Sequence, residues 1–220
     1  MDEGASMQNV ERRNATVSAI AQAAMGGAIG LIMATLLASA CALFLSGDAN
    51  AQAASGPAFN DALEECEQGA SAGAETGRAL GACDFLLRSS DMDQAMRARV
   101  LVDRAVIALN RGDSRNARFD LEDAVRLAPE LGEAHLNLSA ALIATGSRQA
   151  AVEAARQALA LDVEAAHWAW FNLGVAHEHL DRYDAAYEAY VQAAELAPDN
   201  ELIQAQPARF LRHQPDGGAA

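Results

Sequence analysis

Several histidine, cysteine, aspartate and glutamate residues in this sequence are of types that could ligate a metal, catalyse a reaction or form a disulfide. His177 and His179 flank Glu178, a set that could ligate a metal ion. Residues two apart on a helix point to different sides, and the His-Glu-x-x-His spacing is absent, so these side chains are not expected to hold one ion. We therefore predict no metal site, no catalytic residue and no cofactor.

The basic residues exclude several further classes of protein. All 16 are arginines, and the sequence contains no lysine. A P-loop, a Schiff-base enzyme and a protein kinase each need a lysine at the reacting group. The 30 acidic residues give a formal net charge of -14, which opposes binding to a phosphate backbone. Neither an enzyme nor a nucleic-acid-binding protein is expected.

The N-terminal residues have the order of a secretory signal. Arg12 and Arg13 precede a nearly uncharged stretch over residues 15–47, and Ala49 and Ala51 follow it. Signal peptidase accepts only small side chains at this spacing, so residues 1–51 are predicted to be a signal peptide cleaved after Ala51. The apolar stretch is also long enough to cross a bilayer, so an uncleaved anchor in the inner membrane remains the alternative. In both cases the following residues are expected in the periplasm.

Removal of that segment leaves two of the three cysteines, Cys66 and Cys83. Both are equally distant from a predicted turn near Ala74 and Glu75. Residues equidistant from the turn of an antiparallel hairpin lie opposite each other, and an oxidising compartment favours pairing of an even number of cysteines. The sequence therefore predicts a disulfide, with two buried small side chains as the alternative.

The composition favours helices over strands. The sequence is 51% hydrophobic but only 5% aromatic, and it is rich in alanine. A period of 34 to 35 residues runs through it, and in each period two apolar stripes at helical spacing flank a break at Gly112, Gly146 or Asp181. Each period is therefore expected to form a helix hairpin. The alanines that repeat at this period are Ala117, Ala151 and Ala186, followed by Ala124, Ala158 and Ala193.

The third period carries the most complete motif: Trp170, Leu173, Gly174, Ala186, Tyr190, Ala193 and Pro198. These residues stand where the tetratricopeptide repeat family has its W-x2-L-G, A-x3-F, A and P residues, so the period resembles that family. His177 stands where the family has a tyrosine. The resemblance implies an all-α, right-handed superhelical solenoid of antiparallel helix hairpins that binds a protein or peptide partner.

The resemblance also gives boundaries. It implies three repeats over residues 98–131, 132–166 and 167–200. Residues 52–97 are expected to hold a linker and a divergent N-terminal helical hairpin. Residues 201–220 are expected to form a capping helix, which Pro207 would kink or divide, and a disordered tail.

The first helices of the hairpins line a concave groove in the family that this sequence resembles. Asp103, Asn137 and Asn172 share one register on these helices. If they face the groove, the amides could bond the backbone of an extended peptide. The structural alternative is that they brace adjacent repeats, because asparagine inside a helix can bond locally. The apolar candidates beside them are Val102, Val106, Leu136, Ala140, Phe171 and Val175.

We therefore expect binding without turnover by a non-enzymatic periplasmic scaffold. The alternative is a membrane-anchored factor in envelope assembly or biogenesis, tethered by the uncleaved N-terminal helix or by lipid at Cys41. The identity of the partner, the pathway and the oligomeric state do not follow from the sequence, because a fold alone does not name a ligand.

Overall fold

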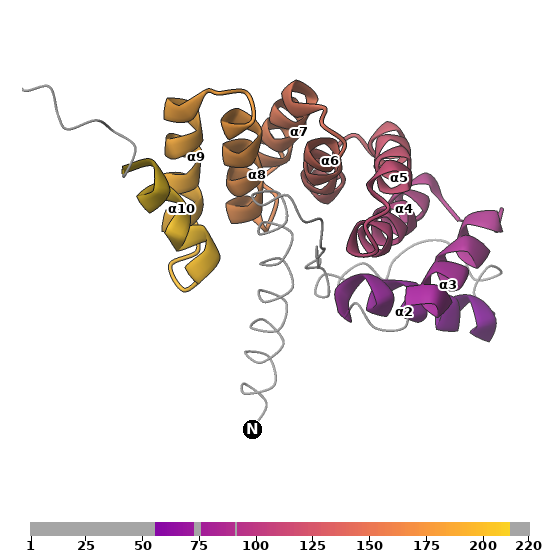
Figure 1. Ribbon diagram of the computed structural model, residues 1–220. Helices are drawn as coiled ribbons and strands as arrows, with labels where there is room; N and C mark the ends of the chain where they lie inside the picture. Colours follow the sequence, from indigo (N-terminus) through magenta and orange to yellow (C-terminus); the bar gives the residue numbers. More distant parts are fainter. Residues whose placement is uncertain (1–55, 73–75, 91, 212–220) are drawn as a thin grey trace, which may run out of the picture. The chain divides into compact units, whose positions relative to one another are not determined.

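A computed structural model describes residues 56–72, 76–90 and 92–211. The predicted signal segment, residues 1–51, and the predicted tail beyond residue 211 lie outside the described residues. Every regular element in the described ranges is an α-helix (Figure 1). None of these helices is long and apolar enough to cross a membrane. The described residues form two compact units, 56–129 and 130–211.

The first unit consists of two helix hairpins. α2 (Pro57–Ala72) and α3 (Thr76–Arg88) form the divergent hairpin, and α4 (Gln94–Asn110) and α5 (Ser114–Leu127) form the first repeat (Figure 1). α4 begins at Gln94, four residues before the predicted start of the first repeat at residue 98. The reason is local: the Asp93 carboxylate accepts a hydrogen bond from the Met96 amide at 2.7 Å and caps the helix.

The second unit holds two further hairpins and a final helix. α6 (Gly132–Ala144) pairs with α7 (Arg148–Ala160), and α8 (Ala166–Glu178) pairs with α9 (Tyr183–Leu196). α10 (Glu201–Leu211) packs on α9 as the predicted cap.

Of the two predicted effects of Pro207, the division of the cap does not occur, because α10 runs through the proline as one helix. Proline removes one backbone donor there. The Gln206 side chain adds a bond in the same turn, since its Nε2 donates to the Leu202 carbonyl at 2.7 Å.

The three predicted breaks have a left-handed backbone. The φ angle is 81° at Gly112, 80° at Gly146 and 57° at Asp181. The residue after each break donates its backbone N–H to a carbonyl five positions earlier, as Asp113 does to Ala108 at 2.9 Å. Glycine adopts this φ without a steric cost, and aspartate tolerates it better than most residues. The same turn therefore joins the two helices of each repeat.

Candidate partner-binding face

α6 and α8, the first helices of the second and third repeats, carry the candidate groove residues of the second unit. Both helices are buried around most of their circumference, α6 over residues 134–142 and α8 over residues 171–177. A helix that is apolar on all sides needs cover on more than the side that packs against its hairpin partner. The candidates that the structure buries are Leu136, Asn137, Ala140, Phe171, Asn172 and Val175.

The two asparagines on these helices already use their donor atoms. Asn172 Nδ2 donates to Ser139 Oγ at 2.8 Å and to the Leu136 carbonyl at 3.5 Å, which ties α8 to α6. Asn137 Nδ2 donates to the Glu133 carbonyl in its own helix at 2.9 Å. The amide nitrogen of Asn172 therefore braces two adjacent repeats, whereas that of Asn137 bonds locally within α6. Among the described residues none donates to either Oδ1, so these oxygens remain available as acceptors.

Gly174 and Tyr190 set the approach of α8 to α9. A Cβ at Gly174 would lie 2.7 Å from the Tyr190 ring, which is fully buried. The Tyr190 hydroxyl donates to Glu178 Oε2 at 2.8 Å, and burial followed by this carboxylate raises the pKa of the tyrosine. Leu173, Ala186, Ala193, Ala117 and Ala151 are also buried, whereas Trp170 is partly buried and Pro198 is exposed.

Sequence reasoning missed Trp168, which starts a row of aromatic rings through the second unit. The ring centroids lie 5.6 Å apart between Trp168 and Phe171, and 5.5 Å apart between Phe171 and Tyr190. Phe210 of α10 continues the row 5.7 Å from Tyr190. The available signal was spacing, since Trp168 precedes Phe171 and Asn172 by one helical turn.

The candidate groove residues of the first unit lie on α4. Val102 and Val106 are buried, and Asp103 is partly buried. Burial raises the pKa of Asp103 to about 7, and the Glu67 carboxylate of α2 adds to this, against the opposing effect of the Arg99 guanidinium. Asp103 therefore changes its charge near neutral pH instead of remaining a fixed anion.

The two cysteines join the helices of the N-terminal hairpin. Cys66 on α2 and Cys83 on α3 form a disulfide, with Cα atoms 5.1 Å apart, and both side chains are fully buried. The bridge closes a loop with a sequence separation of 17 residues. A cross-link of this length stabilises the folded state by roughly 3 kcal/mol, chiefly by restricting the unfolded chain.

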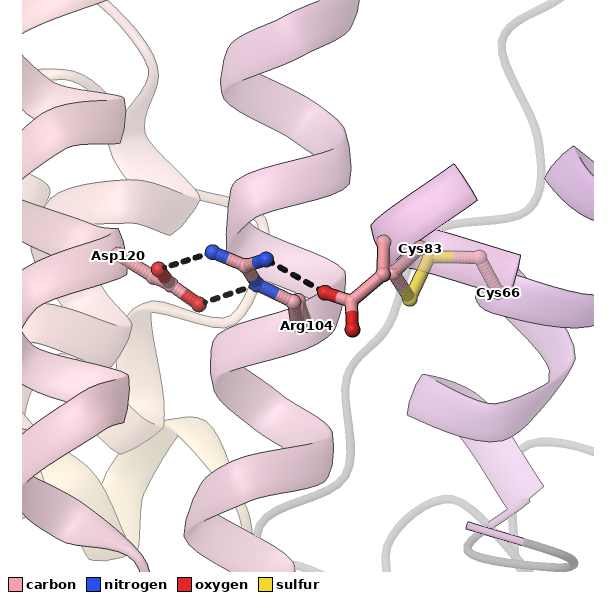
Figure 2. Close-up of a disulfide and its surroundings, with 5 residues drawn as sticks. Cys66, Cys83, Arg104 and Asp120 are labelled. Carbon is pink, nitrogen blue, oxygen red and sulfur yellow. Dashed lines mark hydrogen bonds and ion pairs between the residues drawn. A yellow bond between two sulfur atoms is a disulfide. The ribbon is translucent and has the colours of Figure 1, made fainter. Parts of the chain in front are cut away.

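Beside the disulfide, Arg104 of α4 connects α3, α4 and α5 (Figure 2). Its Nε and Nη2 donate to the two carboxylate oxygens of Asp120 on α5 at 2.7 and 2.6 Å. Its Nη1 donates to Asp84 of α3, the neighbour of Cys83, at 2.7 Å. This bidentate geometry is the strong form of an arginine–carboxylate pair. The hairpin closed by the disulfide is therefore also tied to the first repeat.

The histidines of the sequence pattern have different surroundings. His177 is buried and His179 is exposed. Burial, followed by the charges of Arg156 and Arg182, lowers the pKa of His177, so its imidazole is neutral at pH 7. The described part of the chain contains no group of three His, Cys, Asp or Glu residues that could hold a metal ion.

The third repeat matches a known family model. Residues 167–200 match the model described as a tetratricopeptide repeat, and this span covers α9 and all of α8 except its first residue, with the motif residues around Gly174 and Tyr190. This span is therefore a tetratricopeptide repeat (TPR). A search of the curated proteins finds no match to the chain.

Solved structures of TPR proteins have a similar fold. MamA of Desulfovibrio magneticus RS-1 is 17% identical, with 74% of this chain and 99% of that chain covered and a TM-score of 0.56. A thermophilic TPR protein of Thermus thermophilus is 23% identical, with 70% and 80% covered and a TM-score of 0.51. The first TPR of Spaghetti (RPAP3), bound to the HSP90 peptide SRMEEVD, is 19% identical, with 54% and 93% covered and a TM-score of 0.50. The predicted fold class, an all-α solenoid of TPR-type hairpins, is confirmed.

Proposed function

We propose that this TPR protein is a non-enzymatic scaffold that binds a protein or peptide partner along α6 and α8, and that it does so in the periplasm. The observation that carries the proposal is the pair of acceptor oxygens, Oδ1 of Asn137 and Asn172, which share one register on these helices and receive no donor from the described residues. TPR folds can hold a peptide, as the Spaghetti structure with its HSP90 peptide illustrates.

The chemistry of this face suits an extended peptide. Apolar side chains of the peptide would pack against Ala140 and Val175, and backbone N–H groups would donate to Oδ1 of Asn137 and Asn172. Main-chain hydrogen bonds of this kind supply affinity, and alternate side chains supply specificity. The Nδ2 atoms already donate within the chain, so only the Oδ1 atoms can form hydrogen bonds with a peptide.

The periplasmic location is supported by the order of residues 1–51 and by the disulfide, since such bonds persist in oxidising compartments. The length of the apolar stretch over residues 15–47 favours the second candidate, a membrane-anchored factor in envelope assembly. N-terminal sequencing of the protein from its native envelope separates the two: a start at Gln52 supports the released form, and an intact N-terminus supports the anchor.

The binding face can be tested with two matched arginine substitutions. The full chain captures its partner from the native envelope fraction, and the purified partner is then titrated calorimetrically. Ala144→Arg places a charge on the exposed end of α6, whereas Ala150→Arg places it on the exposed surface of α7. We expect the first variant to lose affinity by roughly tenfold or more and the second to bind like wild type, with unchanged helicity in both. Equal affinity of both variants would remove α6 from the binding site.

A further inference from the structure

α2 is held in the first unit by small side chains. Its large apolar side chains, Phe59 and Leu63, are only partly buried. Its buried residues are Ala62, Cys66, Gly69 and Ala70. A Cβ at Gly69 would lie 2.1 Å from Ala79 Cβ on α3 and 3.2 Å from Ile107 Cδ1 on α4, so α2 approaches both helices closely. Hydrophobic stabilisation grows with the apolar area removed from water, so packing of this kind holds α2 only weakly.

The charge of α2 opposes its position beside α4. The helix contains no arginine, and its acidic residues are Asp61, Glu64, Glu65 and Glu67. Burial, followed by the Glu67 carboxylate, raises the pKa of Asp103 on α4, so the two carboxyl groups repel each other when both are ionised. Arg99 of α4 offsets part of this repulsion. The ion pair of Glu65 with Arg78 of α3 is largely exposed to solvent and adds little.

α3 has attachments to α4 that do not involve α2. Arg97 Nη1 and Nη2 of α4 donate to the Leu87 and Ser89 carbonyls, at the carboxyl end of α3, at 2.7 and 2.6 Å. Arg104 Nη1 of α4 donates to Asp84 of α3 at 2.7 Å. These hydrogen bonds have a charged donor, which makes them stronger than bonds between neutral groups. Departure of α2 would therefore leave α3 attached to α4.

The bond between Cys66 and Cys83 is the covalent attachment of α2 to α3 (Figure 2). Both side chains are fully buried, so the bond forms before α2 is packed in place and is afterwards shielded from reductants in solution. It forms by exchange with an oxidant that carries a disulfide. One cysteine thiolate attacks that disulfide, and the second displaces the oxidant's thiolate from the mixed disulfide. The two cysteines lose two electrons and two protons, and the oxidant becomes a dithiol.

From these contacts we propose that the Cys66–Cys83 bond is a redox latch: it holds α2 against α4, and without it α2 leaves α4 while the other helices stay folded. The bond raises the population of attached α2 by roughly a hundredfold, because a cross-link over a sequence separation of 17 residues removes detached conformations. The latch makes the cover of Asp103 and Ile107 on α4 depend on oxidation of the cysteines. The proposal concerns the first unit and does not depend on partner binding along α6 and α8.

The test compares the full wild-type chain with Cys66→Ala/Cys83→Ala, which keeps two small apolar side chains and removes the bond. Amide hydrogen exchange followed by mass spectrometry reports each helix separately. We expect the amides of α2 to exchange roughly a hundredfold faster in the variant, and those of α4, α5, α8 and α9 to keep their rates within about twofold. Wild type refolded in dithiothreitol should match the variant. Unchanged protection of α2 would overturn the proposal, and so would an equal loss of protection in α4 and α5.

Two further substitutions in the cysteine-free hairpin isolate the opposing charge. Glu67→Gln removes the carboxylate that acts on Asp103, and Asp61→Asn removes an equal charge elsewhere on the exposed side of α2. At pH 8 Asp103 is ionised, because its pKa is about 7. There we expect Glu67→Gln to slow the exchange of α2 by about threefold or more relative to Asp61→Asn. Equal rates in the two variants would overturn the part that charge repulsion plays in releasing α2.

Discussion

Single residues set the distance between the helices of the third repeat. Gly174 has no side chain where the Tyr190 ring crosses α8, and the tyrosine hydroxyl is fixed by Glu178. Glu178 also pairs with Arg209 of α10, so one carboxylate joins α8, α9 and the cap. These contacts explain why the motif has a glycine at position 174 and a tyrosine at position 190.

Gly174→Ala should lower the free energy of unfolding by about 1–3 kcal/mol, because the new Cβ meets the Tyr190 ring at 2.7 Å. Gly81 is the matched control, since a Cβ there meets nothing within 4 Å in the middle of α3. Alanine at that position should stabilise by about 0.5–1 kcal/mol. Urea unfolding followed by circular dichroism measures both, and equal effects would contradict the role of the close approach.

Asp103 should make the stability of the first unit depend on pH. Its pKa is raised from 3.8 to about 7 by burial and by Glu67, so the folded state binds a proton that the unfolded state releases. The resulting stability is fully present below about pH 4 and is lost as pH rises through 7. Between pH 5 and pH 8 wild type should lose about 1–3 kcal/mol more than Asp103→Asn in urea unfolding. Parallel pH profiles would show that the carboxyl is not perturbed.

At the scale of helices, the first repeat uses an ion pair where the later repeats use apolar contacts. Arg104 and Asp120 stand at the register of Leu138 and Ala154 in the second repeat. The Arg104 guanidinium also holds Asp84 of the disulfide-closed hairpin. The exchange of leucine for arginine thus allows one side chain to fasten α3 as well as α5.

Arg104→Leu alone should lower the free energy of unfolding by about 1–3 kcal/mol, because Asp120, whose side chain is 14% exposed, loses its partner. The double variant Arg104→Leu/Asp120→Ala restores the pair of residues found in the later repeats and should recover most of that loss. Guanidinium unfolding of wild type, the two single variants and the double variant gives the coupling energy. Additive losses would contradict a specific interaction between the two side chains.

The sequence predicts features that depend on local conformation and misses those that depend on distant partners. The breaks at Gly112 and Gly146 follow from the steric freedom of glycine, and the hairpins follow from apolar periodicity. The partners of Arg104 lie 16 and 20 residues away, so no local pattern shows them. The hydrogen bond of Asn172 Nδ2 is equally hidden from local patterns, since its acceptor Ser139 lies 33 residues earlier. Asp93 is a local signal for the start of α4, but the repeat period predicts a start of the first repeat at residue 98.

At the scale of the molecule, the second unit combines the matched TPR, the aromatic row and the candidate binding face. Its first helices are buried around most of their circumference, and its acidic residues outnumber its arginines. The first unit contributes a disulfide-closed hairpin and the Arg104 network. We propose that a partner binds along α6 and α8, while α7 presents its exposed side to solvent.

Site-specific photo-crosslinking in the native envelope tests this claim most directly. Ala144 and His179 are exposed and extend the face one turn beyond Ala140 and Val175, so a photoreactive amino acid at either position should capture the partner. The same amino acid at Ala150 or Arg156, both exposed on α7, is the control and should capture none. A crosslinked partner from the first two positions only is the predicted result. Capture from the α7 positions alone, or equally from all four, would contradict binding along α6 and α8.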